Sequence, residues 1–375
     1  MTILELGKFY PPYRGGMESL LRVWAEGFAQ RGARVECVVA NGRARTSHEE
    51  VGGVRVHRLA SWGSWWSASL CPAYLLSPWR YPADLWHVHF PNPLADLAAW
   101  LGPRRAPLVL HYHSDVVRQA GVLRLYAPLL RWLLRRAARI VVASPQQIQF
   151  SPWLQAHREK CEVIPFGVEL ERFALTPART AAVAALRRQA GDQPVLLHIG
   201  RLVEYKGQRH LIEAARGLAA VVWLVGEGPL RIPLEARARA LGVGERLIFW
   251  GDQSDEMLVT LLHACDVFVL PSVTANEAFG LVQLEAMACA KPVVSTALPS
   301  GVASVNLDGV TGLVVPPAEP AALATALRRL LDDPAGRVAL GRAGRSRVEA
   351  EFNQTAMIQR YWALLQRVLE QRQRP

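Results

Sequence analysis

Short apolar, β-branched runs recur along the chain and alternate with longer segments in which leucine and alanine return every three to four positions. The short runs indicate strands of a buried parallel sheet, and the longer segments indicate amphipathic helices. The expected strands lie at residues 3–6, 33–41, 54–59, 86–90, 107–113, 139–144, 162–166, 194–199, 221–225, 246–250, 266–270, 291–296 and 311–315. Two successive series of alternating strands and helices predict an α/β protein with two doubly wound, Rossmann-like domains.

The alternation pauses near residues 165–170, where charged residues and a Pro-Phe-Gly sequence interrupt the apolar pattern. We therefore predict a first domain at residues 1–167 and a second at residues 168–352. The last helical segment, residues 353–375, is expected to pack back toward the first domain. A chain of 375 residues exceeds one usual hydrophobic core, which agrees with two domains.

Composition points to an intracellular protein. No run of eighteen uncharged apolar residues occurs, so no transmembrane helix is predicted. The first residues have the pattern of a strand and lack the basic and long apolar regions of a signal peptide. Five cysteines, an odd number without paired spacing, favour free thiols in a reducing compartment. We expect a cytoplasmic protein.

A net charge of +11 suggests a polyanionic partner, which could be nucleic acid, anionic lipid or a phosphorylated substrate. Residues 122–138 form a basic amphipathic pattern that fits either an anionic membrane surface or a surface helix packing its leucines inward. Its arginines are Arg124, Arg131, Arg135 and Arg136. Residues 61–81 are rich in tryptophan and fit either an interfacial surface or a buried segment. Their tryptophans are Trp62, Trp65, Trp66 and Trp79.

One stretch combines features that suit a sugar nucleotide. After the strand at residues 266–270, a loop carries Glu277, and good helix formers follow at residues 279–288, with Glu285 about two turns into that helix. Three backbone N–H groups would be free at the helix start: those of Phe279, Gly280 and Leu281. Such a helix start favours an anion, and Gly280 allows close approach to the backbone. The loop could hold a phosphate between carboxylates that accept hydrogen bonds from hydroxyl groups.

Other candidate residues also follow predicted strands, at the sheet edge where ligands bind in open parallel sheets. They are His113, Arg201, Gly226, Glu227 and Gly251. A Gly15-Gly16 turn at the entry of the first helix could cradle a phosphate, but it lacks the GxGxxG spacing of a nicotinamide enzyme.

Two cations flank the turn after the strand at residues 194–199. Arg201 and Lys206 could stabilise a departing diphosphate without a metal ion. Lys206 is one of only four lysines in an arginine-rich chain, which favours a functional role. No Asp-x-Asp sequence occurs, so a diphosphate bridged by a metal ion is not expected.

The spacing from Glu277 to Glu285, with Pro271-Ser272 before it and Phe279-Gly280 inside it, resembles the EX7E motif of the retaining GT-B glycosyltransferases of family GT4. Other features of that family occur here in the same order. They are Gly15-Gly16, His113, Gly200-Arg201 with Lys206, and Gly226-Glu227-Gly228. The resemblance covers nearly the whole chain, and it implies a GT-B fold whose two domains face each other across a cleft.

The resemblance implies a retaining, metal-independent hexosyltransferase that needs no cofactor and uses a nucleotide sugar as donor. In this interpretation Arg201 and Lys206 hold the diphosphate, and Glu285 holds the ribose hydroxyls. Glu277 faces the sugar, with the amides of Phe279, Gly280 and Leu281 nearby. His113 lies beside the reacting sugar, and Gly15 and Gly16 lie beside the phosphate. Gly226 and Glu227 complete the donor site. The chain departs from many relatives at residues 300–304, which lack their Gly-Gly-x-Pro-Glu sequence.

By analogy with relatives, the acceptor is expected to be a saccharide or lipid-linked saccharide, used in making a surface polysaccharide. The basic helix and the tryptophans predict an anionic membrane surface as a partner, at the inner face of the plasma membrane. GDP-mannose is the first donor to test and a UDP-sugar the second.

Two alternatives remain open from the residues alone. His87 with His89, and His111 with His113, are pairs at strand ends that share a face, so a zinc-dependent enzyme could use these four side chains. The net charge also allows a nucleic-acid-binding protein, although the arginines are spread over many helices and no RNA- or DNA-binding motif occurs. Nucleic acid is therefore not the expected partner.

Overall fold

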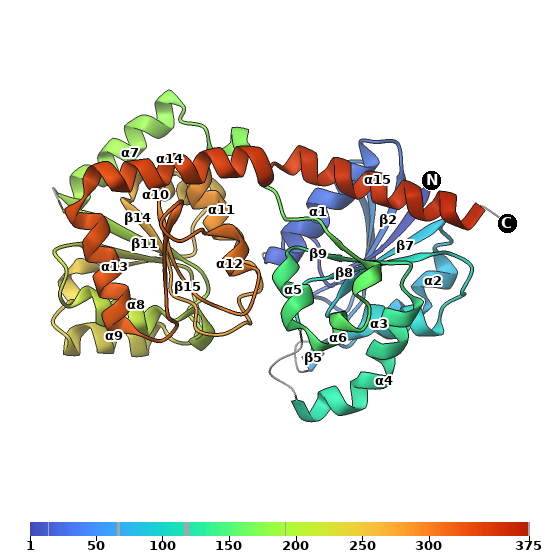
Figure 1. Ribbon diagram of the computed structural model, residues 1–375. Coiled ribbons are helices and arrows are strands. Elements are labelled where there is room, and N and C mark those ends of the chain that lie inside the picture. The colour runs from blue at the N-terminus through green and yellow to red at the C-terminus, as the bar shows by residue number, and fades with distance from the viewer. Residues whose placement is uncertain (14, 66–67, 116–119, 192, 374–375) are drawn as a thin grey trace. The chain divides into compact units, whose positions relative to one another are not determined.

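The computed structural model describes residues 1–375 except residues 14, 66–67, 116–119, 192 and 374–375 (Figure 1). The chain contacts divide it into two compact units. The first comprises Met1–Ile164 and Ala356–Pro375, and the second comprises Pro165–Thr355. Each unit has a sheet of mainly parallel strands covered by helices, as the alternating sequence pattern predicted.

The first unit is built on an eight-stranded sheet in the order β10-β9-β8-β7-β1-β2-β4-β3. Its strands are β1 (Thr2–Leu6), β2 (Arg34–Ala40), β3 (Ser47–Val51), β4 (Val54–Leu59), β7 (Leu85–Phe90), β8 (Leu108–Tyr112), β9 (Arg139–Val142) and β10 (Cys161–Val163). The short strands β5 (Ser64–Trp65) and β6 (Ala68–Ser69) form a separate hairpin. All neighbouring strands of the large sheet are parallel except β3 and β4.

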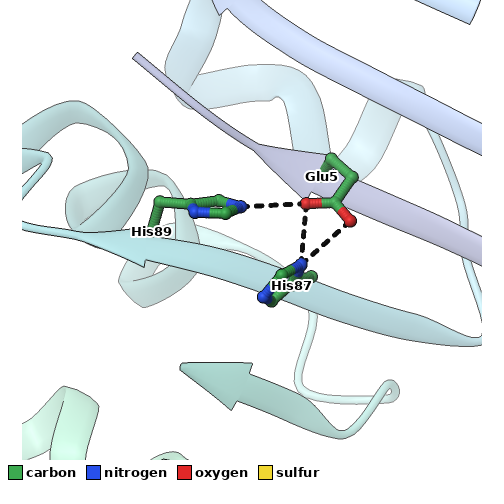
Figure 2. A group of neighbouring side chains, drawn as sticks. All are labelled: Glu5, His87 and His89. Atoms are coloured by element: carbon green, nitrogen blue, oxygen red, sulfur yellow. Dashed lines mark hydrogen bonds and ion pairs between the residues drawn. The ribbon is translucent and has the colours of Figure 1, made fainter. Parts of the chain in front are cut away.

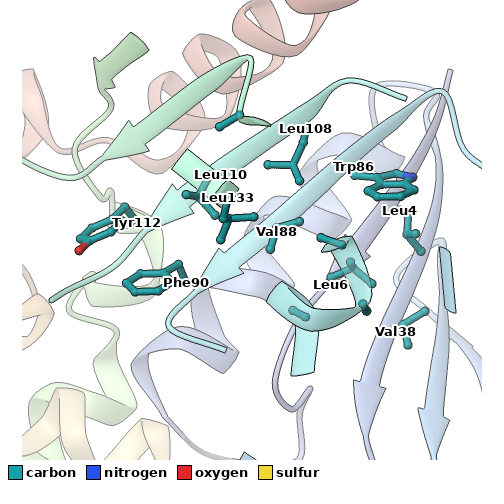
Figure 3. Packing of buried hydrophobic residues seen from close by; sticks show 14 of the residues in the cluster. Leu4, Leu6, Val38, Trp86, Val88, Phe90, Leu108, Leu110, Tyr112 and Leu133 are labelled. Carbon is teal, nitrogen blue, oxygen red and sulfur yellow. The ribbon is translucent and has the colours of Figure 1, made fainter. Parts of the chain in front are cut away.

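One face of this sheet is apolar because alternate residues along each strand point to the same side. Figure 3 shows Leu4, Val88, Leu110 and their neighbours packed together on this face. Buried residues of α3 (Pro93–Leu101) and α4 (Ala120–Arg136) belong to the same cluster. Parallel strands between two helical layers are buried on both faces, which explains why their sequences are apolar runs.

The opposite face of the first sheet is covered by α1 (Gly16–Ala29) and α15 (Gln354–Gln373). Trp24 of α1 packs against Tyr361 of α15, with ring centroids 5.5 Å apart and the ring planes tilted by 47°. The two helices approach closely at Gly27, where a Cβ atom would lie 2.7 Å from Ile358. The remaining helices of this unit are α2 (Ser77–Arg80), α5 (Pro145–Phe150), α6 (Pro152–Gln155) and the 3-10 helix η1 (Pro72–Leu76).

The second unit is built on a six-stranded parallel sheet in the order β13-β12-β11-β14-β15-β16. Its strands are β11 (Val195–Ile199), β12 (Val221–Val225), β13 (Leu247–Gly251), β14 (Val267–Leu270), β15 (Val293–Thr296) and β16 (Gly312–Val315). Its helices are α7 (Pro177–Ala190), α8 (Gln208–Ala215), α9 (Arg231–Ala240), α10 (Asp255–Ala264), α11 (Leu281–Ala288), α12 (Val302–Val305), α13 (Pro320–Asp332) and α14 (Pro334–Glu351).

The segments that suggested a membrane surface have mixed burial. Leu130, Leu133 and Leu134 of α4 are buried, as in an ordinary surface helix, whereas Leu125 of the same helix is 86% exposed. Trp62 and Trp79 are exposed, and Trp66 and the side chains of Trp65 and Arg124 lie outside the described residues. Among the described helices, none has the length and apolar character needed to cross a bilayer.

Candidate active site

The second sheet reverses its winding between β11 and β14, which are neighbours in the sheet although β12 and β13 lie between them along the chain. From β11 the chain winds toward β13, and from β14 it winds toward β16. In open parallel sheets, ligands bind at such a switch point, beyond the carboxyl ends of the strands. The segments that leave these two strands are residues 200–207 and residues 271–280, which contain Arg201, Lys206, Glu277, Phe279 and Gly280 of the predicted site.

These two segments are held against each other by their backbones. The N–H of Val273 donates a hydrogen bond to the carbonyl of Tyr205 at 2.8 Å. Gly207 has a φ of 69°, and a Cβ atom there would lie 1.9 Å from the carbonyl oxygen of Pro271. A residue with a side chain therefore cannot occupy position 207 without separating the two segments.

This close approach brings Lys206 to Glu277. The ammonium nitrogen of Lys206 lies 2.6 Å from Oε2 of Glu277, and both side chains are nearly buried. The hydroxyl of Ser272 donates to the same carboxylate oxygen at 2.9 Å. Burial alone would lower the pKa of Lys206, but the negative charge of Glu277 and its hydrogen bond raise that pKa above its usual value. Lys206 is therefore a fixed positive charge at the switch point.

The loops after β11, β12 and β13 also meet closely. The N–H of Gly226 donates to the carbonyl of Gly251 at 2.8 Å, and a Cβ atom at Gly226 would lie 2.4 Å from the carbonyl oxygen of Gly200. Glu227 accepts a hydrogen bond from Arg231 at 2.8 Å on an exposed surface. Arg201 is exposed beside these loops. Its guanidinium is therefore accessible to a ligand from solvent.

The helix after Glu277 begins later than the sequence suggested. We expected a helix at residues 279–288, but α11 begins at Leu281, because Gly280 has a left-handed φ of 72° and precedes the first turn. Phe279 is buried against Phe166, with ring centroids 4.9 Å apart, so only its backbone could meet a ligand. The N–H of Gln283 donates to the carbonyl of Gly280 at 2.9 Å, and the N–H groups of Leu281 and Val282 at the start of α11 have no intrahelical acceptors.

Glu285 lies one turn into α11 and not two, as a result of this later start. Burial raises the pKa of its carboxyl, and the positive charge of Arg172 opposes that rise. Among the described residues, Glu285 and Arg201 share no hydrogen bond or ion pair with Lys206 or Glu277. The structure thus joins Lys206 directly to Glu277, and it places the other predicted donor residues of the second unit on adjoining loops and on α11.

The first sheet has its own switch point, between β1 and β7. A small pocket lies there, formed by the segments that follow these strands and by the start of α1. It contains two charged residues that the sequence analysis missed, Lys8 and Glu18. Burial lowers the pKa of Lys8 and raises that of Glu18, and each charge partly opposes the shift of the other. The only sequence signal for them was that Lys8 is a rare lysine directly after a predicted strand.

The three predicted residues of this unit lie near these strand ends. Gly15 precedes α1 and Gly16 is its first residue, and a Cβ atom at Gly15 would clash with the carboxylate of Glu18. His113 follows β8, where its N–H donates to the carbonyl of Phe90 at 2.9 Å. His113 is buried, and burial lowers the pKa of its imidazole to about 3, so the ring is neutral at physiological pH.

The rings of the four strand-end histidines lie close together, as the zinc alternative required, but two of them, His87 and His89, are bonded to a carboxylate. Figure 2 shows Glu5 of β1 between His87 and His89 of β7. One ligand atom from each of these residues lies within 4.8 Å of the others, which is a spacing that a metal ion could use. Hydrogen bonds already join these atoms, at 2.8 Å for His87 and 3.0 Å for His89. The hydrogen bonds between Glu5, His87 and His89 therefore make these three side chains a buried polar network.

The sequence matches two family models that together span most of the chain. Residues 15–167 match "Glycosyl transferase 4-like domain", and residues 186–347 match "Glycosyl transferases group 1". Neither match points to a zinc enzyme or to a nucleic-acid-binding protein, so those two alternatives are not favoured.

Two curated relatives are similar over much of their length. The D-rhamnosyltransferase WbpZ of Pseudomonas aeruginosa is 38% identical over 270 residues, which cover 72% of this chain and 70% of that protein. The O-antigen chain mannosyltransferase C of Escherichia coli is 31% identical over 378 residues, 99% of each chain. The solved structure of sucrose-phosphate synthase from Thermosynechococcus elongatus has the same fold. It has a TM-score of 0.82 and 24% identity, and the match covers 98% of this chain and 99% of that one.

Proposed function

The chain belongs to the GT4-type glycosyltransferases with the GT-B fold, and from that premise we propose that it is a retaining, metal-independent hexosyltransferase using a nucleotide sugar. The observation that carries this proposal is the pair of Lys206 and Glu277, 2.6 Å apart at the switch point of the second sheet. A cation and a carboxylate at that place suit a ligand that has both a phosphate and hydroxyl groups.

The donor diphosphate would be held by positive charge and by backbone dipoles. Negative charge develops on the diphosphate as the glycosidic bond breaks, and pre-positioned cations and N–H groups stabilise it most at that moment. Lys206 supplies a cation whose raised pKa keeps it charged at neutral pH. Arg201 supplies a second cation from the exposed loop, and the start of α11, with Gly280 before it, supplies N–H groups.

The sugar and the ribose would be held by the two carboxylates of the EX7E spacing. Both contacts of Glu277 with described residues fall on Oε2, and Oε1 would accept hydrogen bonds from the transferred sugar. Glu285 would accept from the ribose hydroxyls, while Gly226 and Glu227 line the same strand ends. In the first unit, His113 would lie beside the sugar, and Gly15 and Gly16 beside the phosphate.

Retention of configuration would follow if the acceptor attacked the anomeric carbon on the same face from which the leaving diphosphate departs. The acceptor oxygen forms a bond to the anomeric carbon as the bond from that carbon to the phosphate oxygen breaks. The acceptor proton passes to the departing phosphate oxygen, so no protein nucleophile is required. His113, a neutral imidazole, would orient a sugar hydroxyl during this step.

The donor and acceptor are suggested by what the relatives transfer. The two curated relatives are named for transferring D-rhamnose and mannose, and the second for building an O-antigen chain. D-rhamnose is 6-deoxymannose, so both sugars have the manno configuration. GDP-mannose is therefore the first donor to test, a UDP-sugar the second, and a saccharide or lipid-linked saccharide the expected acceptor.

A lipid-linked acceptor would place the protein at the cytoplasmic face of a membrane. Exposed apolar side chains occur on η1, α2 and the end of α3, which pack against one another. These are Leu76, Trp79, Trp100 and Leu101. These exposed apolar side chains could insert into a bilayer interface, and the net charge of +11 would attract the protein to anionic lipids.

The test is a panel of GDP-, UDP-, ADP- and dTDP-sugars, with thermal stabilisation and sugar transfer measured for each. One nucleotide sugar should stabilise the protein, and NMR of the product should show the anomeric configuration of the donor. Transfer should persist in EDTA. An inverted product, or transfer abolished by EDTA and restored by a divalent cation, would refute the retaining or metal-independent part.

A further inference from the structure

A row of buried polar side chains on the first sheet is connected to His113 by hydrogen bonds. Glu5 is the register partner of His87, and His89 is the register partner of His111. Alternation along the strands puts all of them on the face covered by α1 and α15. The rings of His89 and His113 stack with centroids 5.4 Å apart. Apart from His113, none of these residues was assigned a role in transfer above.

The distances define which nitrogen of each ring carries a proton. Oε2 of Glu5 lies 3.0 Å from Nε2 of His89 (Figure 2). A carboxylate oxygen accepts, so His89 is protonated on Nε2 and its Nδ1 is an acceptor. That Nδ1 lies 3.1 Å from Nε2 of His113, which must therefore donate. His113 is thus protonated on Nε2, and its Nδ1 is the acceptor nitrogen.

This assignment holds both for an ionised Glu5 and for a Glu5 protonated on Oε1. Burial raises the pKa of Glu5, so a protonated carboxyl has to be considered. Among the described residues, the one hydrogen-bond partner of Oε1 of Glu5 is Nδ1 of His87, at 2.9 Å, and the same nitrogen lies 2.8 Å from Oε2. A proton on Oε1 would be donated to His87 and would leave Oε2 to accept from His89. The ionised carboxyl and the carboxyl protonated on Oε1 therefore hold the same tautomers of His89 and His113.

We propose that Glu5 is a positioning residue that acts through His89 to hold His113 in the Nε2–H tautomer, so that Nδ1 of His113 accepts a hydrogen bond from a hydroxyl of the bound sugar. The sugar contact rests on the proposed function, whereas the tautomer rests only on the distances above. Burial lowers the pKa values of His89 and His113 to about 3, which keeps both rings neutral, as the assignment requires.

Two substitutions of Glu5 separate this role from simple packing. Glu5→Leu removes the acceptor, so His89 would move its proton to Nδ1 and donate to His113, which would then be protonated on Nδ1. Glu5→Gln reproduces the protonated carboxyl, with its carbonyl accepting from His89 and its NH₂ donating to His87. It should therefore keep the native tautomer of His113.

Tyr361 provides a matched control at the other end of the network. Its hydroxyl lies 2.6 Å from Nε2 of His87 and 3.2 Å from Nδ1 of His111. Tyr361 is fully buried, so Tyr361→Phe disturbs the same core. The substitution breaks hydrogen bonds on the His87 side of Glu5 and leaves the bonds from Glu5 to His89 and from His89 to His113 in place.

The experiment is NMR of the imidazole nitrogens in the full-length protein labelled with ¹⁵N-histidine, with His113 assigned by loss of its signals in His113→Ala. Long-range ¹H–¹⁵N correlations distinguish protonated from unprotonated ring nitrogens. The wild type, Glu5→Gln and Tyr361→Phe should show His113 protonated on Nε2, and Glu5→Leu should show it protonated on Nδ1. A wild type protonated on Nδ1, or an unchanged pattern in folded Glu5→Leu, would overturn the proposal.

Kinetics provide the second readout. Glu5→Leu should lower kcat by about tenfold or more with little change in the donor KM, while Glu5→Gln and Tyr361→Phe stay near wild type. Equal losses in Glu5→Leu and Glu5→Gln would contradict the proposal. If His113→Ala kept full activity while the spectra matched expectation, the proposed catalytic contact of His113 would fail and the tautomer assignment would stand.

Discussion

The ammonium of Lys206 lies 2.6 Å from Oε2 of Glu277, and the two residues come from the two segments that leave neighbouring strands in opposite winding directions. Lys206→Ala and Glu277→Ala should remain folded and lose about 10²- to 10³-fold in kcat, because each removes a preorganised charge from the donor site. Steady-state transfer assays and circular dichroism check this. Lys291→Ala, at another rare lysine, is the control, and near-normal turnover in either site variant would contradict the assigned roles.

Gly207→Ala should damage both stability and transfer. The added Cβ would lie 1.9 Å from the carbonyl oxygen of Pro271, and its φ of 69° is unfavourable for alanine. We expect a loss of at least about 1–3 kcal/mol in unfolding free energy, since both strain and a clash act. Gly242→Ala is the matched control, because its φ is 68° but nothing lies within 4 Å of the added atom. Equal destabilisation of both variants in urea titrations would show that the contact with Pro271 is unimportant.

Arg201→Ala should weaken nucleotide binding without affecting stability. Its side chain is exposed, so removing it leaves the packing of the second sheet intact. The diphosphate would lose one charge-assisted contact, and the Kd for a nucleoside diphosphate should rise by about tenfold. Isothermal titration calorimetry measures the change, with Arg239→Ala on α9 as a control. An unchanged Kd in Arg201→Ala would remove this residue from the donor site.

The stability of the second unit should fall as pH decreases from 6.5 toward 4, in part because of His198. Burial lowers the pKa of His198 to about 4, so in this range the unfolded chain binds a proton that the folded chain does not. The unfolding free energy then decreases by up to about 1.4 kcal/mol per pH unit from this one group. His198→Asn should flatten the slope by that amount below pH 6.5 and leave the slope near pH 8 unchanged. Identical slopes below pH 6.5 would refute the contribution of His198.

Sedimentation with anionic vesicles tests the membrane proposal. At about 0.15 M ionic strength, wild-type protein should sediment with phosphatidylglycerol vesicles, and Leu76→Ser with Trp79→Ser should reduce the bound fraction several-fold. Both side chains are more than half exposed, so the double variant should fold normally. Ile232→Ser, which is 76% exposed in the second unit, is the control. If the wild type stays in the supernatant, the membrane surface is not a partner.

The strands of both large sheets could be predicted because most are buried on two faces and are therefore short apolar runs. β3 was missed because its sequence, SHEEV, is polar and its residues are mostly exposed at the edge of the first sheet. The start of α11 was placed too early because periodicity cannot show that Gly280 adopts a left-handed conformation, which ends the loop and sets the helix at Leu281. Tertiary contacts determine such boundaries, and the local pattern does not contain them.

Most of the candidate donor-site residues were chosen because they follow a predicted strand, and ligands bind at that edge of parallel sheets. Lys206 contacts Glu277 because β11 and β14 are neighbours in the sheet, and the order of strands in a sheet could not be predicted from the sequence pattern. Glu5 could not be recognised, because it sits inside an apolar run and its partner histidines lie on another strand. Tyr361 carries no signal either, since one buried aromatic on a helix is ordinary core.

Helix α15 belongs to the first unit although the whole second unit precedes it in the chain. Tyr361, Leu364 and Leu365 are completely buried, so they fill part of the core beneath the first sheet. During synthesis, the second unit emerges from the ribosome as one continuous segment, whereas the first unit must wait for its last helix. The N-terminal half is therefore finished last, and in a nascent chain that stalls before residue 356 only α1 would cover the histidine-lined face.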